Sequence, residues 1–168
     1  MTMSAMDSQA QGETPDIPQP EWTERVCLRT VDAEGGIRDV VIQLGEPCTA
    51  VVELLDDQSR TVFGGTDYRD CLTQVRRQLE HEGRLLCCQG ARPNVHASGQ
   101  LFQFSNGLEA YVFPPDIRKQ VSEVVDIFAA ASPADVVSLA DQRTAFMRYW
   151  DEVRRSRKSS QTSTTDRV

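Results

Sequence analysis

Residues Arg84–Phe113, RLLCCQGARPNVHASGQLFQFSNGLEAYVF, contain the signals that decide how the rest of the chain is expected to fold. Residues 85–88 are all apolar, a pattern typical of a strand that is covered on both faces. The pair Asn106-Gly107 is a strong hairpin signal and would join Gln100–Phe104 to Leu108–Phe113. The stretch therefore predicts the centre of a sheet, with the polar loop between its strands at the sheet's edge.

Two further hairpins are predicted before this stretch. Apolar and polar residues alternate in Arg25–Val31, a glycine turn follows at 35–36, and Ile37–Leu44 continues the alternation. A second pair of short strands, Ala50–Leu55 and Arg60–Phe63, flanks an Asp-rich turn. Each hairpin has one apolar side, so we expect one face of the resulting sheet to be buried.

The sequence predicts two main helices. Tyr68, Leu72, Val75 and Leu79 form one apolar stripe of a helix that starts at Thr66 or Asp67 and ends at Gly83. Arg76 lies off that stripe and is expected in water. The second helix starts after Ser138, where Asp141 completes a capping-box spacing, and runs to about Arg157. Residues 123–128 favour a strand, with a helix as the close alternative.

These elements predict an α+β fold, a mostly antiparallel sheet of five to seven strands with the two main helices packed on one face. We expect one globular domain over residues 22–157, with disordered tails at 1–21 and 158–168, because both ends are polar and nearly free of large apolar side chains.

The net charge of −7 argues against general affinity for nucleic acid or for anionic membranes. The charge is uneven: residues 1–70 carry −9 and residues 71–168 carry +2. No apolar run is long enough to span a bilayer, and five cysteines are most simply free thiols in a reducing compartment. We therefore predict a cytoplasmic protein without a membrane partner.

The densest cluster of polar side chains lies in the loop of the opening stretch, where Arg92, Asn94, His96 and Ser98 follow one another at alternate positions. Arginine offers a planar fork for carboxylate or phosphate, and histidine can change its charge near neutral pH. These four residues are the predicted binding site. The alternative is that Arg92 pairs with an acidic neighbour and the others hydrogen-bond to the loop backbone.

Cys87, Cys88 and His96 are the candidate catalytic residues, since an imidazole can take a thiol proton and stabilise the thiolate. Against this, cysteines among leucines on a strand are usually inert core residues. Their spacing matches no zinc finger or ribbon, and the sequence predicts no metal site and no cofactor.

The run Cys88-Gln89-Gly90-Ala91-Arg92-Pro93-Asn94-Val95-His96-Ala97-Ser98-Gly99, with Gly107 and Ala110-Tyr111-Val112 after it, resembles a segment of small, mostly uncharacterised bacterial proteins. In those proteins the Ser-Gly pair is usually followed by Met and a glycine-rich turn, where this chain has Gln100-Leu101-Phe102. The resemblance implies a bacterial origin and a shared fold, and it brings no established activity.

The leading functional hypothesis is a small acidic protein that acts by binding another protein, as regulators and immunity proteins do. The alternative is a small enzyme of a specialised bacterial pathway that uses the Arg92–Ser98 loop with Cys87 or Cys88. The sequence does not identify the ligand or partner, and it leaves open whether the chain forms a homo-oligomer.

Overall fold

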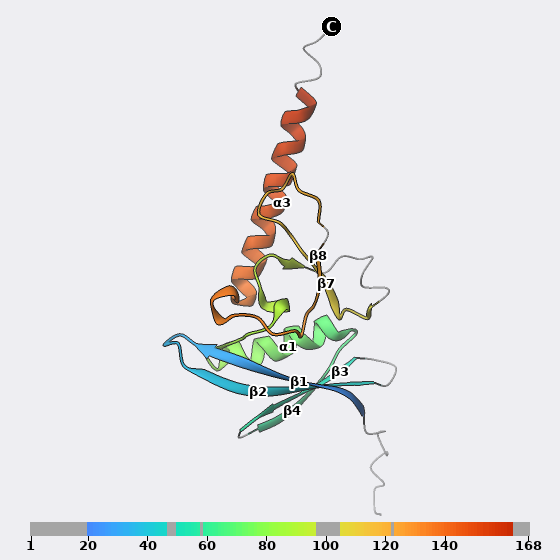
Figure 1. Ribbon diagram of the computed structural model, residues 1–168, viewed down its shortest axis with the longest axis vertical. Coiled ribbons are helices and arrows are strands. Elements are labelled where there is room, and N and C mark those ends of the chain that lie inside the picture. The colour runs from blue at the N-terminus through green and yellow to red at the C-terminus, as the bar shows by residue number, and fades with distance from the viewer. Residues whose placement is uncertain (1–19, 47–49, 58, 97–104, 122, 163–168) are drawn as a thin grey trace, which may run out of the picture.

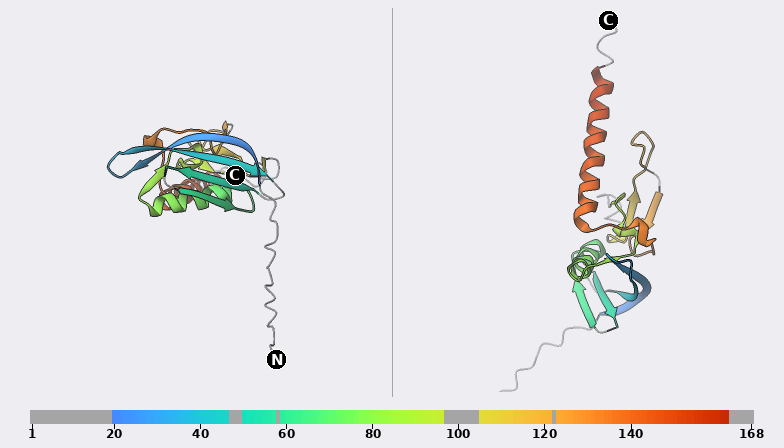
Figure 2. Two further views of the ribbon diagram at one scale, coloured as in Figure 1. Left: turned by 90° about the horizontal axis from the view of Figure 1, so that it is seen from below. Right: turned by 90° about the vertical axis from the view of Figure 1, so that its left-hand side faces the viewer.

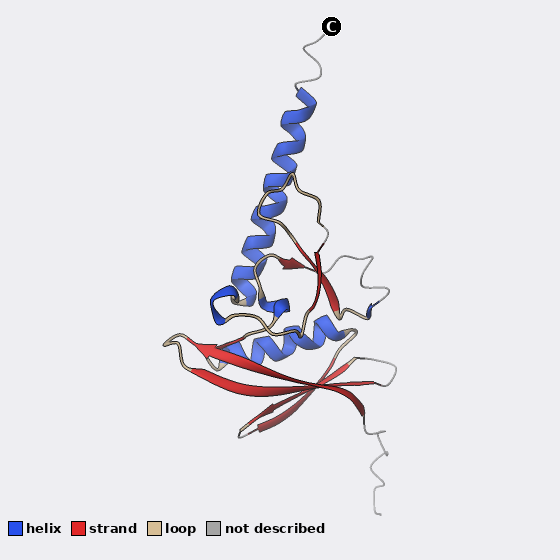
Figure 3. Ribbon diagram, in the orientation of Figure 1, coloured by secondary structure: helices blue, strands red, loops and turns tan. Residues whose placement is uncertain are grey.

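Two antiparallel sheets and two α-helices make up the part of the chain that the computed structural model describes, residues 20–46, 50–57, 59–96, 105–121 and 123–162. The larger sheet has five strands in the order β4-β3-β2-β1-β5, and the smaller has three in the order β6-β7-β8. Figure 1 shows the larger sheet at one end of the molecule and Figure 3 distinguishes the helices from the strands. The predicted α+β class with mostly antiparallel pairing is confirmed.

The first four strands form a meander that confirms both predicted hairpins. Their bounds are Glu21–Asp32 (β1), Ile37–Glu46 (β2), Val51–Asp56 (β3) and Ser59–Gly64 (β4). Alternate residues point to opposite faces, and Leu28, Ile42 and Leu54 are all buried on the same face. Burial of these side chains stabilises the sheet against the helix that covers it.

Helix α1, Tyr68–His81, covers that face with the predicted stripe, and Leu72, Val75 and Leu79 are buried in the same core. Asp67 caps the helix, because its carboxylate accepts a hydrogen bond from the amide of Asp70 at 2.9 Å. The chain leaves the helix through Gly83, whose φ of 75° favours glycine.

Strand β5, Arg84–Leu86, pairs with β1 at the edge of the larger sheet, so the prediction of an inner strand at residues 85–88 is wrong. The continuation of β5 is nevertheless buried, because residues 129–131 lie along it. The amide of Ala131 donates to the carbonyl of Cys87 at 3.1 Å, and the amide of Gln89 donates to Ala129 at 2.8 Å. A loop thus provides the cover that an inner strand receives from its neighbour.

The second sheet contains two strands of the opening stretch, Val95–His96 (β6) and Glu109–Val112 (β7), with β7 at its centre, and one later strand, Glu123–Asp126 (β8). Strand β8 confirms the strand that was favoured over a helix at residues 123–128. The predicted hairpin arm Gln100–Phe104 lies outside the described residues. The turn at Asn106 docks on the start of α1, where its carbonyl accepts from the amide of Tyr68 at 3.0 Å.

Helix α3, Leu139–Thr162, begins near α1 and then projects away from the larger sheet (Figures 1 and 2). Ser138 caps it as predicted, since its hydroxyl oxygen accepts from the amide of Asp141 at 3.1 Å. The helix continues past Arg157, where the sequence placed its end. Whereas α1 packs on the larger sheet, α3 packs through its aromatic side chains on Phe113, directly after β7 of the smaller sheet. Two short 3-10 helices, Gln89–Ala91 (η1) and Pro133–Asp135 (η2), complete the connections.

Candidate functional site

The junction between α1, α3 and the segment around η1 is built on Arg76, which was expected in water but is only 3% exposed. Its guanidinium donates to the carbonyl of Gly90 at 3.1 Å and to the carbonyl of Val137 at 2.8 Å. Glu80, one turn along α1, lies 3.6 Å from it and balances its charge. The site thus rests on a buried arginine that bonds to backbone from two distant segments.

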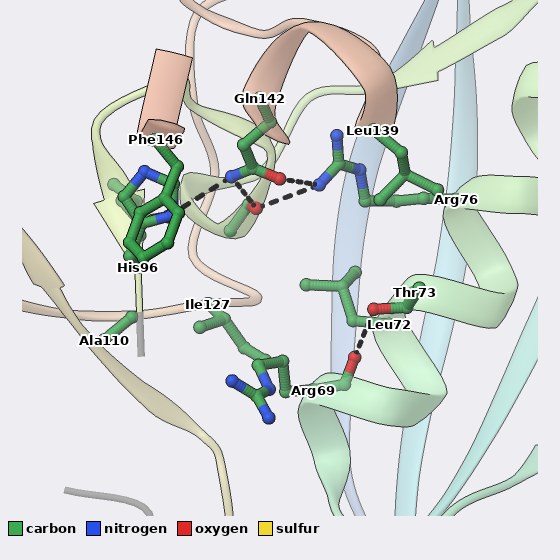
Figure 4. A pocket seen from close by; sticks show the side chains of 12 residues that line it. Arg69, Leu72, Thr73, Arg76, His96, Ala110, Ile127, Leu139, Gln142 and Phe146 are labelled. Atoms are coloured by element: carbon green, nitrogen blue, oxygen red, sulfur yellow. Dashed lines mark hydrogen bonds between the residues drawn. The ribbon is translucent and has the colours of Figure 1, made fainter. Parts of the chain in front are cut away.

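Gln142 on α3 completes this network from the other side (Figure 4). Its side-chain oxygen accepts from Arg76 at 2.5 Å, and its amide group lies within hydrogen-bond distance of the carbonyls of Gly90, Arg92 and Val95, at 2.9, 2.7 and 3.2 Å. One side chain therefore connects the start of α3 to the loop in which the sequence placed the binding site.

A cavity of about 250 Å³ lies beside this network, between α1, β7 and α3 (Figure 4). Its polar wall includes Arg76 and Gln142, and its apolar wall includes Ile127 and Phe146. Gly90 lines it between Leu72 of α1 and Ile127: a Cβ there would lie 2.6 Å from the Leu72 side chain and 3.0 Å from the Cβ of Ile127. Only glycine allows this approach. Because the polar atoms of Arg76 and Gln142 already bond to one another and to backbone, they act mainly as supports for the loop.

The structure places the predicted binding residues on two sides of one loop. Arg92 donates to the side-chain oxygen of Gln89 at 2.7 Å and lines a different hollow from His96. Asn94 lines both hollows, and its side-chain amide donates to the carbonyl of Phe113 at 3.2 Å. Ser98 lies outside the described residues. Arg92 and His96 therefore do not converge on one pocket.

His96 belongs to a stack of rings that the sequence did not predict. Its ring lies 4.5 Å from Phe146 and 5.5 Å from Phe113, and Phe113 stacks on Tyr149 at 5.0 Å, with 15° between the planes. Trp150 meets Phe113 edge to face at 6.1 Å. Stacked and edge-to-face pairs of this kind stabilise a packed cluster beyond the area that they bury.

Beside this stack lies an open hollow of about 330 Å³, which we call the aromatic groove. One wall is α3, through Ala145 and Tyr149, and the other is formed by the segments that carry Pro93, His96 and Phe113–Pro115. The lining is mostly apolar and its rings are held in place by the stack and by two hydrogen bonds between Asn94 and Phe113. The groove can accept an apolar side chain of a ligand with little rearrangement.

The candidate nucleophiles Cys87 and Cys88 are both buried. Burial raises the pKa of the Cys88 thiol to about 12, despite the nearby charge of Arg76, and burial also raises the pKa of Cys87. A thiol with a raised pKa holds its proton at neutral pH, and the thiolate is the nucleophilic form. The environment of both cysteines therefore opposes the catalytic hypothesis.

Thiol labelling of the native protein is expected to separate these cysteines from Cys27, which is exposed on β1. With iodoacetamide at about pH 8 we expect Cys27 to be alkylated, whereas Cys71, Cys87 and Cys88 react only after unfolding. Peptide mass spectrometry of samples quenched over time measures each site. Alkylation of Cys87 or Cys88 as fast as Cys27 would restore the catalytic hypothesis.

We expect the free energy of unfolding to decrease when the pH falls below the ordinary pKa of histidine, because of His96. Burial lowers the pKa of His96, although its hydrogen bond to the carbonyl of Pro93 acts in the opposite direction. Above about pH 6.5 the ring is neutral in both states. Below it, the unfolded chain takes up a proton that the folded chain resists, so the free energy of unfolding falls.

Urea unfolding at about pH 7 and about pH 5 measures this effect. The variant His96→Phe keeps a ring in the stack and removes the titrating group, so it should lose less stability than the wild type over this interval. His81→Gln, at the exposed end of α1, is the matched control and should follow the wild type. Equal losses in His96→Phe and wild type would contradict the assignment.

Within the described residues, no three His, Cys, Asp or Glu side chains are close enough to share a metal ion. No α-helix in that part of the chain is long and apolar enough to cross a membrane. The site residues that sequence reasoning missed are Arg76, Gln142 and Tyr149. Only the amphipathic pattern of the last helix, which contains Phe146 and Tyr149, could have indicated one wall of the groove.

Comparison with known proteins adds no assignment to this geometry: no protein-family model matches the chain, and no curated protein matches it significantly.

Proposed function

We propose that this chain acts by binding another protein, as regulatory and immunity proteins do, and that the aromatic groove receives part of that partner. The observation that carries the proposal is an open, mostly apolar groove with preset walls of rings and prolines. Exposed apolar hollows of this kind are typical of sites that bind ligands or proteins.

The composition of the groove matches the centre of a protein interface. Aromatic residues are enriched there, and the largest contributions come from side chains that fill well-packed pockets. Tyr149 and Phe113 present ring surface, while the ring stack behind them limits the conformational entropy lost on binding. The groove lies beside α3, and this helix projects from the body of the molecule (Figure 2). A large partner can therefore reach the groove.

Site-specific photo-crosslinking in the native host tests the proposal. The photoreactive residue p-benzoylphenylalanine replaces Pro115, which is exposed and belongs to the groove lining, or Thr144, which is exposed on α3 and does not line the groove. We expect a discrete crosslinked protein from position 115 and none from position 144. Crosslinks of equal yield at both positions, or at neither, would refute binding in the groove.

Truncation of Tyr149 is expected to weaken the same complex. Tyr149→Ser removes a ring from the groove wall, and loss of a central aromatic anchor commonly weakens binding about thirtyfold. Met147→Ala is the matched control, because Met147 is 50% exposed and does not line the groove. Competition between unlabelled variants and the crosslinking protein measures both effects. An unchanged competition curve for Tyr149→Ser would contradict the role of the groove.

A further inference from the structure

The end of the molecule that carries the aromatic groove has the opposite charge to the rest of the chain. Residues 113–121 and 143–158, which form the β7–β8 connection and the projecting part of α3, hold eight basic and three acidic side chains, a net charge of +5. The whole chain has a net charge of −7, so the remainder carries −12. The β7–β8 connection and the projecting part of α3 lie side by side in Figures 1 and 2. The groove therefore opens in a locally positive field.

Exposed Lys and Arg side chains occur on both segments that form the groove walls, outside the groove lining itself. On α3, Arg148 is exposed and directly precedes Tyr149 of the groove wall, and Arg157 is exposed about two turns beyond Tyr149, on the continuation of the line from Ala145 through Tyr149 to Val153. Lys119 is exposed on the opposite connection, which carries Pro114 and Pro115 into the groove. Among the described residues, neither Arg148 nor Arg157 takes part in a salt bridge within 4 Å.

We infer that the groove binds an acidic segment of the partner protein, in which an aromatic or large aliphatic side chain enters the groove and flanking carboxylates pair with Arg148, Arg157 and Lys119. This inference rests on the proposed function and specifies its partner. Arginine pairs with carboxylates through a planar fork, and complementary charge accelerates association and sets orientation. The mostly apolar lining favours an amino-acid side chain over a charged sugar-phosphate backbone.

Phage display tests the inference without assuming a peptide sequence in advance. A random library of peptides of about twelve residues is selected against the immobilised full-length chain. We expect the enriched peptides to carry net negative charge and at least one aromatic or large aliphatic residue. A synthetic copy of the most enriched peptide should bind at least about tenfold more weakly when the salt concentration rises from about 0.05 M to about 0.5 M.

Variants locate the peptide on the molecule. Ala145→Arg, which fills the groove, and Tyr149→Ser, which removes part of its wall, should each abolish or strongly weaken binding. The double variant Arg148→Glu/Arg157→Glu should weaken it at least about tenfold. Arg77→Glu makes a charge change on exposed α1 surface and is the matched control. Circular dichroism of each variant shows that the fold is intact.

Enrichment of neutral or basic peptides, no enrichment, or acidic peptides that bind Ala145→Arg and Tyr149→Ser as well as wild type would overturn the inference. Displacement of the peptide by a single strand of twenty thymidines would also overturn it, in favour of nucleic-acid binding. The proposed function can survive this failure: a protein crosslinked at position 115 through a neutral or basic segment would retain protein binding and exclude the acidic partner.

Discussion

Replacing Arg76 by methionine is expected to lower the free energy of unfolding by about 3–5 kcal/mol, the usual range when one partner of a buried charged network is removed. The substitution would leave the carbonyl of Val137 and the side-chain oxygen of Gln142 without this donor, and the carbonyl of Gly90 with Gln142 alone. Each buried polar group left unpaired costs about 1–3 kcal/mol. The similar length of methionine keeps most of the packing, so the loss reports mainly on the hydrogen bonds.

Urea unfolding followed by tryptophan fluorescence measures this change, with Trp22 in the larger sheet and Trp150 on α3 as probes. Arg77→Met is the matched control, because Arg77 is the next residue of α1 and is exposed; we expect a change within about 0.5 kcal/mol. Arg76→Lys should also destabilise the protein, because an ammonium group lacks the planar fork. A loss for Arg76→Met no larger than for Arg77→Met would show that the network contributes little.

Gln142→Ala in both backgrounds tests whether Arg76 and Gln142 act as one unit. The two side chains share a hydrogen bond and both bond to the carbonyl of Gly90. We therefore expect the double variant to be more stable than the sum of the single losses predicts, with a coupling of about 0.5–3 kcal/mol. Additive losses would place the two side chains in independent roles.

The second large effect is expected at Phe128, which is 0% exposed and follows β8 where the two sheets meet. Phe128→Ala should cost about 3–5 kcal/mol through lost apolar burial and the cavity that remains. The backbone on either side of Phe128 is held by hydrogen bonds: Ile127 donates to Leu108 at 2.8 Å, and Ala129 donates to Asp126 at 3.1 Å. Because these bonds hold the backbone in place, the core cannot easily collapse into the cavity.

The same urea titration measures this loss. Val124→Ala on β8 is the matched control, since Val124 is 42% exposed and its truncation leaves no cavity in the core; we expect a change of less than about 1 kcal/mol. If Phe128→Ala and Val124→Ala destabilise the protein equally, Phe128 does not connect the two sheets through packing.

Local signals predicted most of the elements. The two hairpins, α1 with its stripe and Asp67 cap, and the start of α3 at Ser138 all follow from spacing along a short piece of chain. Such elements are set by side-chain alternation and by caps that bond within three residues. Residues 123–126 were harder to predict, since a strand and a helix fitted the same apolar residues, and pairing with β7 decided the strand.

Contacts between distant residues explain what the sequence missed. Arg76 appeared solvent-exposed from the helical pattern because the surface that covers it comes from Val137 and Gln142, some 60 residues away. In the same way, an inner strand was predicted at residues 85–88 because both of its faces are apolar, but a loop at residues 129–131 covers it in place of a neighbouring strand.

By itself, the sequence determined the α+β class, the apolar faces of the first two hairpins and the positions of the helix caps, because these depend on side-chain periodicity and on hydrogen bonds between near neighbours. Only the tertiary structure decided that Arg92 and His96 line different hollows, that Arg76 is buried, and that rings from three separate segments form the aromatic groove. Burial and ring stacking depend on which segments meet in space, and that information is spread over the whole chain.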